Sequence, residues 1–76
     1  GVIRVGWDPP PSVAGCNLYR SPAAFSGIQS AQKLNSSPIV ESHHLDLPPS
    51  EGTYYYGVTC VDAAGNESAL SAVVSA

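Results

Sequence analysis

Charged side chains are scarce in this chain. Asp, Glu, Lys and Arg together make up 12% of its 76 residues, which is about half the share found in an average soluble domain. The three basic residues, Arg4, Arg20 and Lys33, are scattered along the sequence, and the formal net charge is −3. Nucleic acids and anionic lipid surfaces are bound by clustered cations. The sequence therefore predicts no nucleic-acid partner and no attachment to an anionic membrane.

Long hydrophobic runs and motifs for chemistry are missing as well. A membrane-spanning helix needs roughly 20 consecutive apolar residues, and no run approaches that length, so we expect no membrane insertion. No CxxC, HxH, HxxxH or GxSxG pattern occurs. His43 and His44 are neighbours on an extended stretch, so their side chains point to opposite faces. We expect no metal, no cofactor and no catalytic residue, and hence a protein that is not an enzyme.

Acidic and amide side chains gather around one turn. Asp62, Asn66 and Glu67 lie close together in the sequence, and Asp8 belongs to another turn. A calcium ion takes about six to eight oxygen ligands, which these residues would have to supply together. Asp and Asn also bond to the backbone of their own turns. We favour this turn chemistry over a calcium site.

What the sequence does contain is a succession of short strand patterns. Hydrophobic residues make up 43% of the chain, and seven Pro and seven Gly punctuate them. Alternation in the first run places Ile3, Val5 and Trp7 on one face. Helix signals are nearly absent, so the pattern predicts an all-β chain. The expected strands cover residues 2–7, 16–20, 32–34 (weakly), 39–40 together with 43–47, 53–62 and 70–74.

Two segments resemble a known family. Gly15-Cys16-Asn17-Leu18-Tyr19-Arg20-Ser21 is similar to the third-strand signature of bacterial extracellular fibronectin type III domains. Residues 52–68, which include Gly-Thr-Tyr-Tyr-Tyr and Val-Thr-Cys-Val-Asp-Ala-Ala-Gly-Asn-Glu-Ser, resemble their sixth strand and the hairpin that follows. The sequence departs from the family at three points: cysteines at 16 and 60, a longer loop over residues 21–32, and no first strand.

The resemblance implies a fold and a class of function. The fold is an immunoglobulin-like antiparallel β-sandwich of about six to seven strands, formed by one domain over residues 1–76. The function is that of a non-catalytic module, extracellular or on the cell surface, that acts as a spacer or contacts neighbouring domains or other protein subunits. Two alternatives are a structural subunit completed by a neighbour's strand, and an accessory domain of a secreted enzyme that contacts polysaccharide.

The family's strand order also bears on the two cysteines. Cys16 and Cys60 point inward on strands that are antiparallel neighbours in the family. If Leu18 faces Val58, then Cys16 faces Cys60, because opposing positions in an antiparallel ladder keep a constant sum. The resemblance therefore predicts a Cys16–Cys60 disulfide. Two buried free thiols are the alternative.

The aromatic residues receive roles in the same way. The resemblance implies that Tyr54 is the corner tyrosine, whose hydroxyl bonds to the preceding turn. It also places Trp7 in the core, where we expect it to be buried between the two sheets against Tyr56 and Val58. Tyr19 and Tyr55 are expected to face outward from adjacent strands. They form a possible contact surface for carbohydrate or protein, or an ordinary cross-strand pair that covers the sheet.

The missing first strand leaves an open edge. In the family the first strand pairs with the second, which here covers Ile3, Arg4, Val5 and Gly6. Unpaired edge groups invite another strand. Three explanations stand: the strand is lost from this chain, the edge is tolerated or covered by the C-terminal segment, or a neighbouring chain adds a strand.

Overall fold

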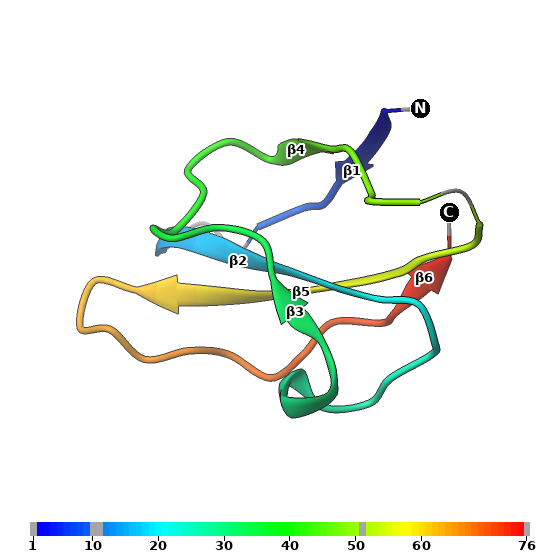
Figure 1. The fold of residues 1–76 in the computed structure, drawn as a ribbon. Helices are drawn as coiled ribbons and strands as arrows, with labels where there is room; N and C mark the ends of the chain where they lie inside the picture. Colours follow the sequence, from blue (N-terminus) through cyan, green and yellow to red (C-terminus); the bar gives the residue numbers. More distant parts are fainter. Residues whose placement is uncertain (1, 10–11, 51, 76) are drawn as a thin grey trace.

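Alternating apolar positions form strands that pair into two antiparallel sheets (Figure 1). The structure is a computed structural model and describes residues 2–9, 12–50 and 52–75. The small sheet pairs β1 (Ile3–Gly6) with β4 (His43–Asp46). The large sheet has the order β3-β2-β5-β6, from β3 (Gln32–Lys33), β2 (Val13–Ser21), β5 (Tyr55–Asp62) and β6 (Val74–Ser75). The all-β antiparallel prediction is confirmed: the described part has six strands and one short 3-10 turn, η1 (Ile28–Ser30).

The hydrophobic core lies between the two sheets. Its buried members come from both: Val5 from β1, Cys16 and Leu18 from β2, and Tyr54, Tyr56, Val58 and Cys60 from β5 and the residue before it. Their alternate spacing follows from the period of two along a strand, and it confirms the faces predicted for β2 and β5. Trp7 packs against this cluster, but it is only partly buried, so the expectation of a fully buried tryptophan is wrong in its extent.

The last strand is shorter than the predicted run over residues 70–74. Pairing of β6 with β5 is confined to Val74–Ser75 and Tyr55–Tyr56. Before β6, two serines take over part of the ladder. The Ser71 hydroxyl accepts from the Val58 amide, and the Ser71 amide donates to the Val58 carbonyl. Ser68 bonds to Cys60 in the same two ways. Hydroxyl groups replace main-chain carbonyls here, which strand periodicity does not predict.

The long loop after β2 covers the outer face of the large sheet. Its Phe25 is 9% exposed, and it lies over Gly57 together with Leu70 and Val73. A Cβ atom at position 57 would lie 2.8 Å from Leu70 Cδ1 and 3.3 Å from Phe25 Cζ. Glycine is therefore required at position 57 for this close approach, and the face that strand alternation assigns to solvent is largely covered.

The hairpin after β5 follows the predicted turn chemistry. Gly65 has a φ of 88°, which lies in the left-handed region where glycine is favoured. The Asp62 carboxylate accepts from the amides of Ala64 and Asn66 and from the Asn66 side chain. These bonds to its own turn lower the pKa of Asp62, and the bond from the Asn66 amide contributes most.

Candidate functional site

Four features of the structure could carry function, and three of them turn out to be structural. They are a buried ion pair between the sheets, a disulfide within the large sheet, a polar cluster on the large sheet, and the exposed side of the small sheet. In the first three, the polar or sulfur groups of the side chains bond to one another within the feature. The fourth leaves apolar side chains and backbone groups without partners among the described residues.

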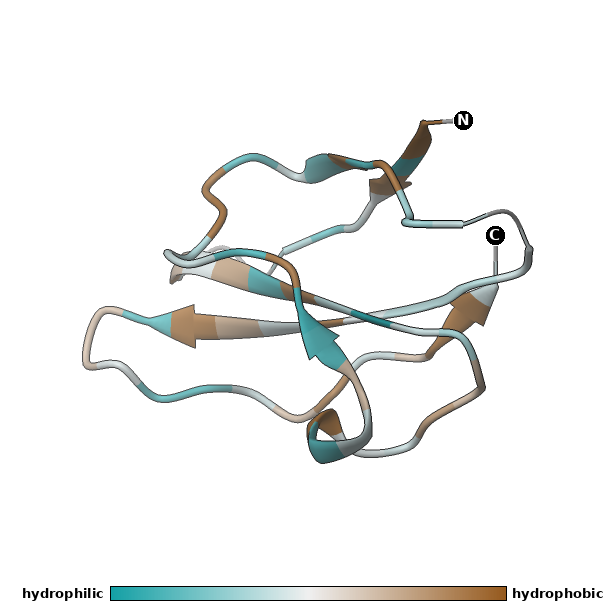
Figure 2. Cartoon of the chain, in the orientation of Figure 1, coloured by the Kyte–Doolittle hydropathy of each residue, from teal (hydrophilic) through white to brown (hydrophobic). Residues whose placement is uncertain are grey.

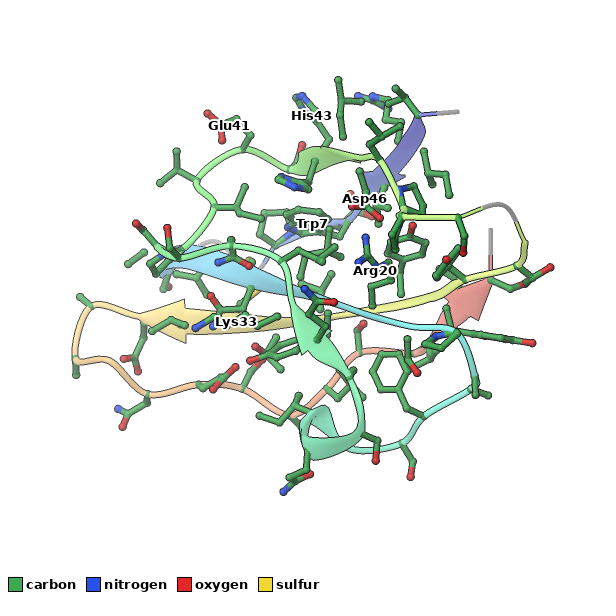
Figure 3. All side chains as sticks on the ribbon, viewed as in Figure 1. Trp7, Arg20, Lys33, Glu41, His43 and Asp46 are labelled. Atoms are coloured by element: carbon green, nitrogen blue, oxygen red, sulfur yellow. A yellow bond between two sulfur atoms is a disulfide. The ribbon has the colours of Figure 1, made fainter. Side chains whose placement is uncertain are left out.

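The buried ion pair joins the two sheets. Arg20 from β2 points toward Asp46 from β4 (Figure 3), and its Nη1 lies 2.9 and 3.0 Å from the two carboxylate oxygens. The side chains are each 9% exposed. The Tyr56 hydroxyl donates to the same carboxylate at 2.7 Å. Burial, followed by this hydrogen bond, raises the pKa of Tyr56, so the phenol stays a neutral donor.

The guanidinium has further partners, which also belong to the fold. Its Nη2 donates to Gln32 Oε1 at 3.3 Å, and its Cζ lies 5.5 Å from the Tyr54 ring centroid. A pocket of about 460 Å³ opens here, lined by Arg20, Ser21, Pro22, Ser30, Gln32, Pro49, Ser50 and Tyr54. Because Asp46 already balances the positive charge, this pocket offers little to an anionic ligand.

The predicted disulfide is present. Cys16 pairs with Cys60 in the β2–β5 ladder, two positions from the pair formed by Leu18 and Val58. The two Cα atoms are 3.9 Å apart and the sulfurs are bonded. Among the described residues no cysteine is free. The register expected from the family strand order therefore holds, and the bridge crosses two adjacent strands of one sheet.

A polar cluster lies on the outer face of the large sheet around Glu67. One oxygen of its carboxylate accepts from the Tyr19 hydroxyl at 2.7 Å, from Asn17 Nδ2 at 3.2 Å and from the Thr59 hydroxyl. The bond from Thr59, followed by that from Tyr19, lowers the pKa of Glu67. The pKa of Tyr19 is raised, chiefly by burial. Through its bonds to Asn17 and Tyr19, the carboxylate links the segment after the β5 hairpin to β2.

The proposed tyrosine surface is not exposed as expected. Tyr19 does project from the outer face of the large sheet, but only 5% of it is exposed. Tyr55 is half-buried. The expectation of an exposed pair is wrong for Tyr19, because Glu67 binds its hydroxyl and Phe25 and Leu70 cover the neighbouring Gly57. Sequence alternation gives the face of a side chain but not what a distant loop places over it.

The other residues singled out from the sequence lie apart from one another. The Tyr54 hydroxyl lies 2.8 Å from Ser50 Oγ in the preceding turn, so it bonds to that turn as predicted, through a side-chain hydroxyl. His43 is exposed and points away from the molecule (Figure 3), whereas His44 is half-buried on the opposite face of β4. Within residues 2–9, 12–50 and 52–75, no three His, Cys, Asp or Glu side chains gather as metal ligands would. That same part of the chain contains no helix suited to crossing a membrane.

The exposed side of the small sheet differs from all of these. Alternation along β1 and β4 places Arg4 opposite Leu45 and Gly6 opposite His43. Val2 and Leu47 extend the same face at one end. We call these residues the outer face: Val2, Arg4, Gly6, His43, Leu45 and Leu47. Figure 2 shows hydrophobic positions along both strands. Val2, Leu45 and Leu47 are 64%, 59% and 70% exposed.

The second feature of the small sheet is its open edge. β1 is a strand over Ile3–Gly6, as predicted, and within the described ranges it pairs only with β4. No other strand of the described chain runs along its far side in Figure 1. The open edge was predicted from the sequence, whereas the outer face and the contact between Arg20 and Asp46 were not. The period of two, which makes Arg20 inward like Leu18 and Leu45 outward like His43, was the available signal.

The chain matches no protein-family model, no curated protein and no solved structure.

Proposed function

We propose that the chain is a non-catalytic module of an extracellular or cell-surface protein, built as an immunoglobulin-like β-sandwich of the fibronectin type III kind. It acts by contact with neighbouring domains or other protein subunits. The observation that carries the proposal is the group of exposed apolar side chains on the outer face of the small sheet, where Val2, Leu45 and Leu47 are more than half exposed. Contiguous exposed apolar side chains mark contact surfaces.

Two further observations support this assignment. The Cys16–Cys60 disulfide suits an oxidising compartment, because cytosolic thiols are kept reduced. The clustered polar side chains are already engaged: the buried Arg20, Asp46 and Tyr56 with one another, and the exposed Glu67 with three side chains of the large sheet. A catalytic group must be free to bind substrate or transfer a proton, whereas these groups hold the fold together.

The polysaccharide alternative is less well supported. It depends on Tyr19 and Tyr55 as a stacking surface, and Tyr19 is buried with its hydroxyl bound to Glu67. One half-buried tyrosine is a poor platform for a sugar ring. The alternative of a subunit completed by another strand has a specific observation in its favour, the open edge of β1.

Site-specific photocross-linking tests the proposed contact. A photoreactive phenylalanine replaces Leu45 on the outer face or, as the matched control, Val74 on β6, which is 55% exposed. Each chain is mixed with the extracellular proteins of cells that produce it. We expect one discrete adduct from position 45 and none from position 74. Excess unlabelled chain should compete for it, whereas the Leu45→Asp/Leu47→Asp variant should not.

Two results would contradict the proposal. One is the absence of any competed adduct from position 45. The other is specific binding of the chain to glycans on an array together with no protein adduct, which would favour the polysaccharide alternative.

A further inference from the structure

The open edge of β1 presents the backbone groups of alternate residues. The Trp7 amide donates to the Ser42 carbonyl at 2.9 Å, and the register continues with Val5 opposite His44 and Ile3 opposite Asp46. In an antiparallel ladder, residues that bond to the partner alternate with residues whose groups point away from it. The amides and carbonyls of Arg4, Gly6 and Asp8 therefore face away from β4.

The charges along the β1 edge of one copy complement those along the same edge of a second copy. Arg4 and Asp8 are both exposed. Asp8 lies two residues beyond the end of β1, and the alternation continued past Trp7, which still bonds to Ser42, places it on the same face as Arg4, with Gly6 midway between them. Within the described ranges the only ion pair is that of Arg20 with Asp46. If a second β1 runs antiparallel about Gly6, Arg4 meets Asp8 of the other copy, and this happens twice because the arrangement is symmetric.

The same register also brings apolar side chains together on the face of β1 that points toward the core. It places Val5 opposite Trp7 of the second copy. Trp7 packs on the core but remains partly exposed, so a neighbouring strand would cover apolar surface. Pro9 does not interfere, because the missing amide hydrogen of an odd-numbered residue lies on the β4 side and not on the open edge. Gly6 at the centre has no side chain to clash with its own copy.

The free edge of β4 lacks these properties. The residues on its inner side are His44, which is polar, and Asp46, which is already buried against Arg20. Other self-pairings of β1 are also poorer. Centring the pair on Arg4 opposes two like charges, and centring it on Val5 leaves Arg4 opposite Gly6 without a counter-charge.

We propose that the partner of the β1 edge is a second copy of this chain. The two β1 strands pair antiparallel about Gly6, and the two small sheets join into one four-stranded sheet with reciprocal Arg4–Asp8 ion pairs. The inference rests on the proposed function in taking the small sheet as the contact region. Because only short strands meet, the dimer is weak and forms at high concentration.

Charge exchange tests the register directly. Sedimentation equilibrium over a concentration series compares the chain with Arg4→Asp and with Asp8→Arg. Each substitution creates two like-charge contacts, so we expect the dimer dissociation constant to rise roughly tenfold or more. A mixture of the two variants should form a heterodimer, and the double variant Arg4→Asp/Asp8→Arg should recover self-association.

Matched controls carry the same changes of charge elsewhere. Lys33→Asp on β3 controls for Arg4→Asp, and Glu41→Arg in the loop before β4 controls for Asp8→Arg; both positions are exposed. Neither should change dimerisation beyond a general effect of net charge. A second readout is amide hydrogen exchange. With rising concentration the Arg4 and Gly6 amides should become protected, whereas that of Val5, already bonded to β4, should not change.

Three outcomes would overturn the proposal. A chain that stays monomeric at millimolar concentration has no such dimer. A dimer that is indifferent to both charge changes, or whose formation protects His43 and Leu45 instead, uses another surface. If dimerisation fails while the adduct from position 45 persists, the second copy is not the partner, but the proposed contact function remains. If the adduct is lost while dimerisation persists, the dimer remains, but the proposed contact with other proteins is contradicted.

Discussion

Arg20 and Asp46 form a contact that depends on both members being present. Each is buried, and together with Tyr56 they form one hydrogen-bonded group between the sheets. Removing one charge from a buried pair leaves the other without compensation, which typically costs more than the pair contributes. The pair therefore fixes how the small sheet lies on the large one more than it adds net stability.

Asp46→Ala should lower the free energy of unfolding by about 3–5 kcal/mol, because it leaves the Arg20 charge buried and alone. Urea denaturation measures this. The exposed Glu41→Ala is the control and should have little effect. The double variant Arg20→Met/Asp46→Leu should recover much of the loss. A single variant as stable as the unchanged chain would mean that Arg20 escapes to solvent.

Glu67 should make stability fall in acid. Its pKa is lowered in the folded chain from an ordinary value of 4.5, first by the Thr59 hydroxyl. A carboxyl whose folded pKa is depressed contributes stability above its unfolded pKa, and that contribution is lost as pH falls through the folded pKa. Thermal unfolding from pH 5 downward measures the loss, which should begin below pH 4.5. Glu67→Gln should flatten the profile there; an unchanged slope would contradict this role.

At the scale of elements, the segment before β6 depends on serine hydroxyls as much as on the backbone. Ser68 and Ser71 each accept from an amide of β5 and donate their own amide to a carbonyl of β5. Serine is not among the residues that are enriched in strands, so the sequence alone predicts neither where this segment bonds nor that β6 has only two residues. The hydrogen bonds that attach this segment to β5 come from two separate serines, so substitution can remove them one at a time.

Ser71→Ala should lower the free energy of unfolding by about 1–3 kcal/mol, because the Val58 amide loses its acceptor. Hydrogen exchange at the Val58 amide should become faster at the same time. Ser26→Ala, in the exposed part of the loop after β2, is the control and should change neither quantity. Unaltered exchange at Val58 would show that another acceptor takes the place of Ser71.

At the scale of the whole molecule, size limits stability. A chain of 76 residues buries only roughly 60% of its unfolded surface, so a covalent link makes a large difference. The disulfide joins strands that are far apart in sequence, with a separation of 44 residues. Most of the chain between them, including β3 and β4, is thereby confined even when unfolded.

Reduction of the Cys16–Cys60 bond should lower the free energy of unfolding by up to about 4 kcal/mol, from the lost restriction on the unfolded chain. Chemical denaturation with and without reductant measures the difference. The Cys16→Ala/Cys60→Ala variant should be insensitive to reductant. Two cysteines that react with iodoacetamide in denaturant before any reduction would show that the bond is not formed.

The sequence by itself determined the strands before the last one, to within a few residues at their ends, and the faces of their side chains. A period of two assigns Ile3, Val5, Leu18 and Val58 inward, and the turn residues around Gly65 end the strongest strand. These signals act between neighbours in the chain, so they survive without knowledge of the fold. The Cys16–Cys60 pairing needed one further premise, the family's strand order, after which the register follows from arithmetic.

Only the tertiary structure decided what covers each face and which polar groups meet. Tyr19 is buried because Phe25, Leu70 and Glu67 come from segments distant in sequence, and Asp46 finds Arg20 across the core. The outer face with Leu45 and Leu47 stays exposed because no other described element packs on it. Burial depends on the sum of contacts from the whole chain, whereas periodicity records only the direction in which a side chain leaves its own strand.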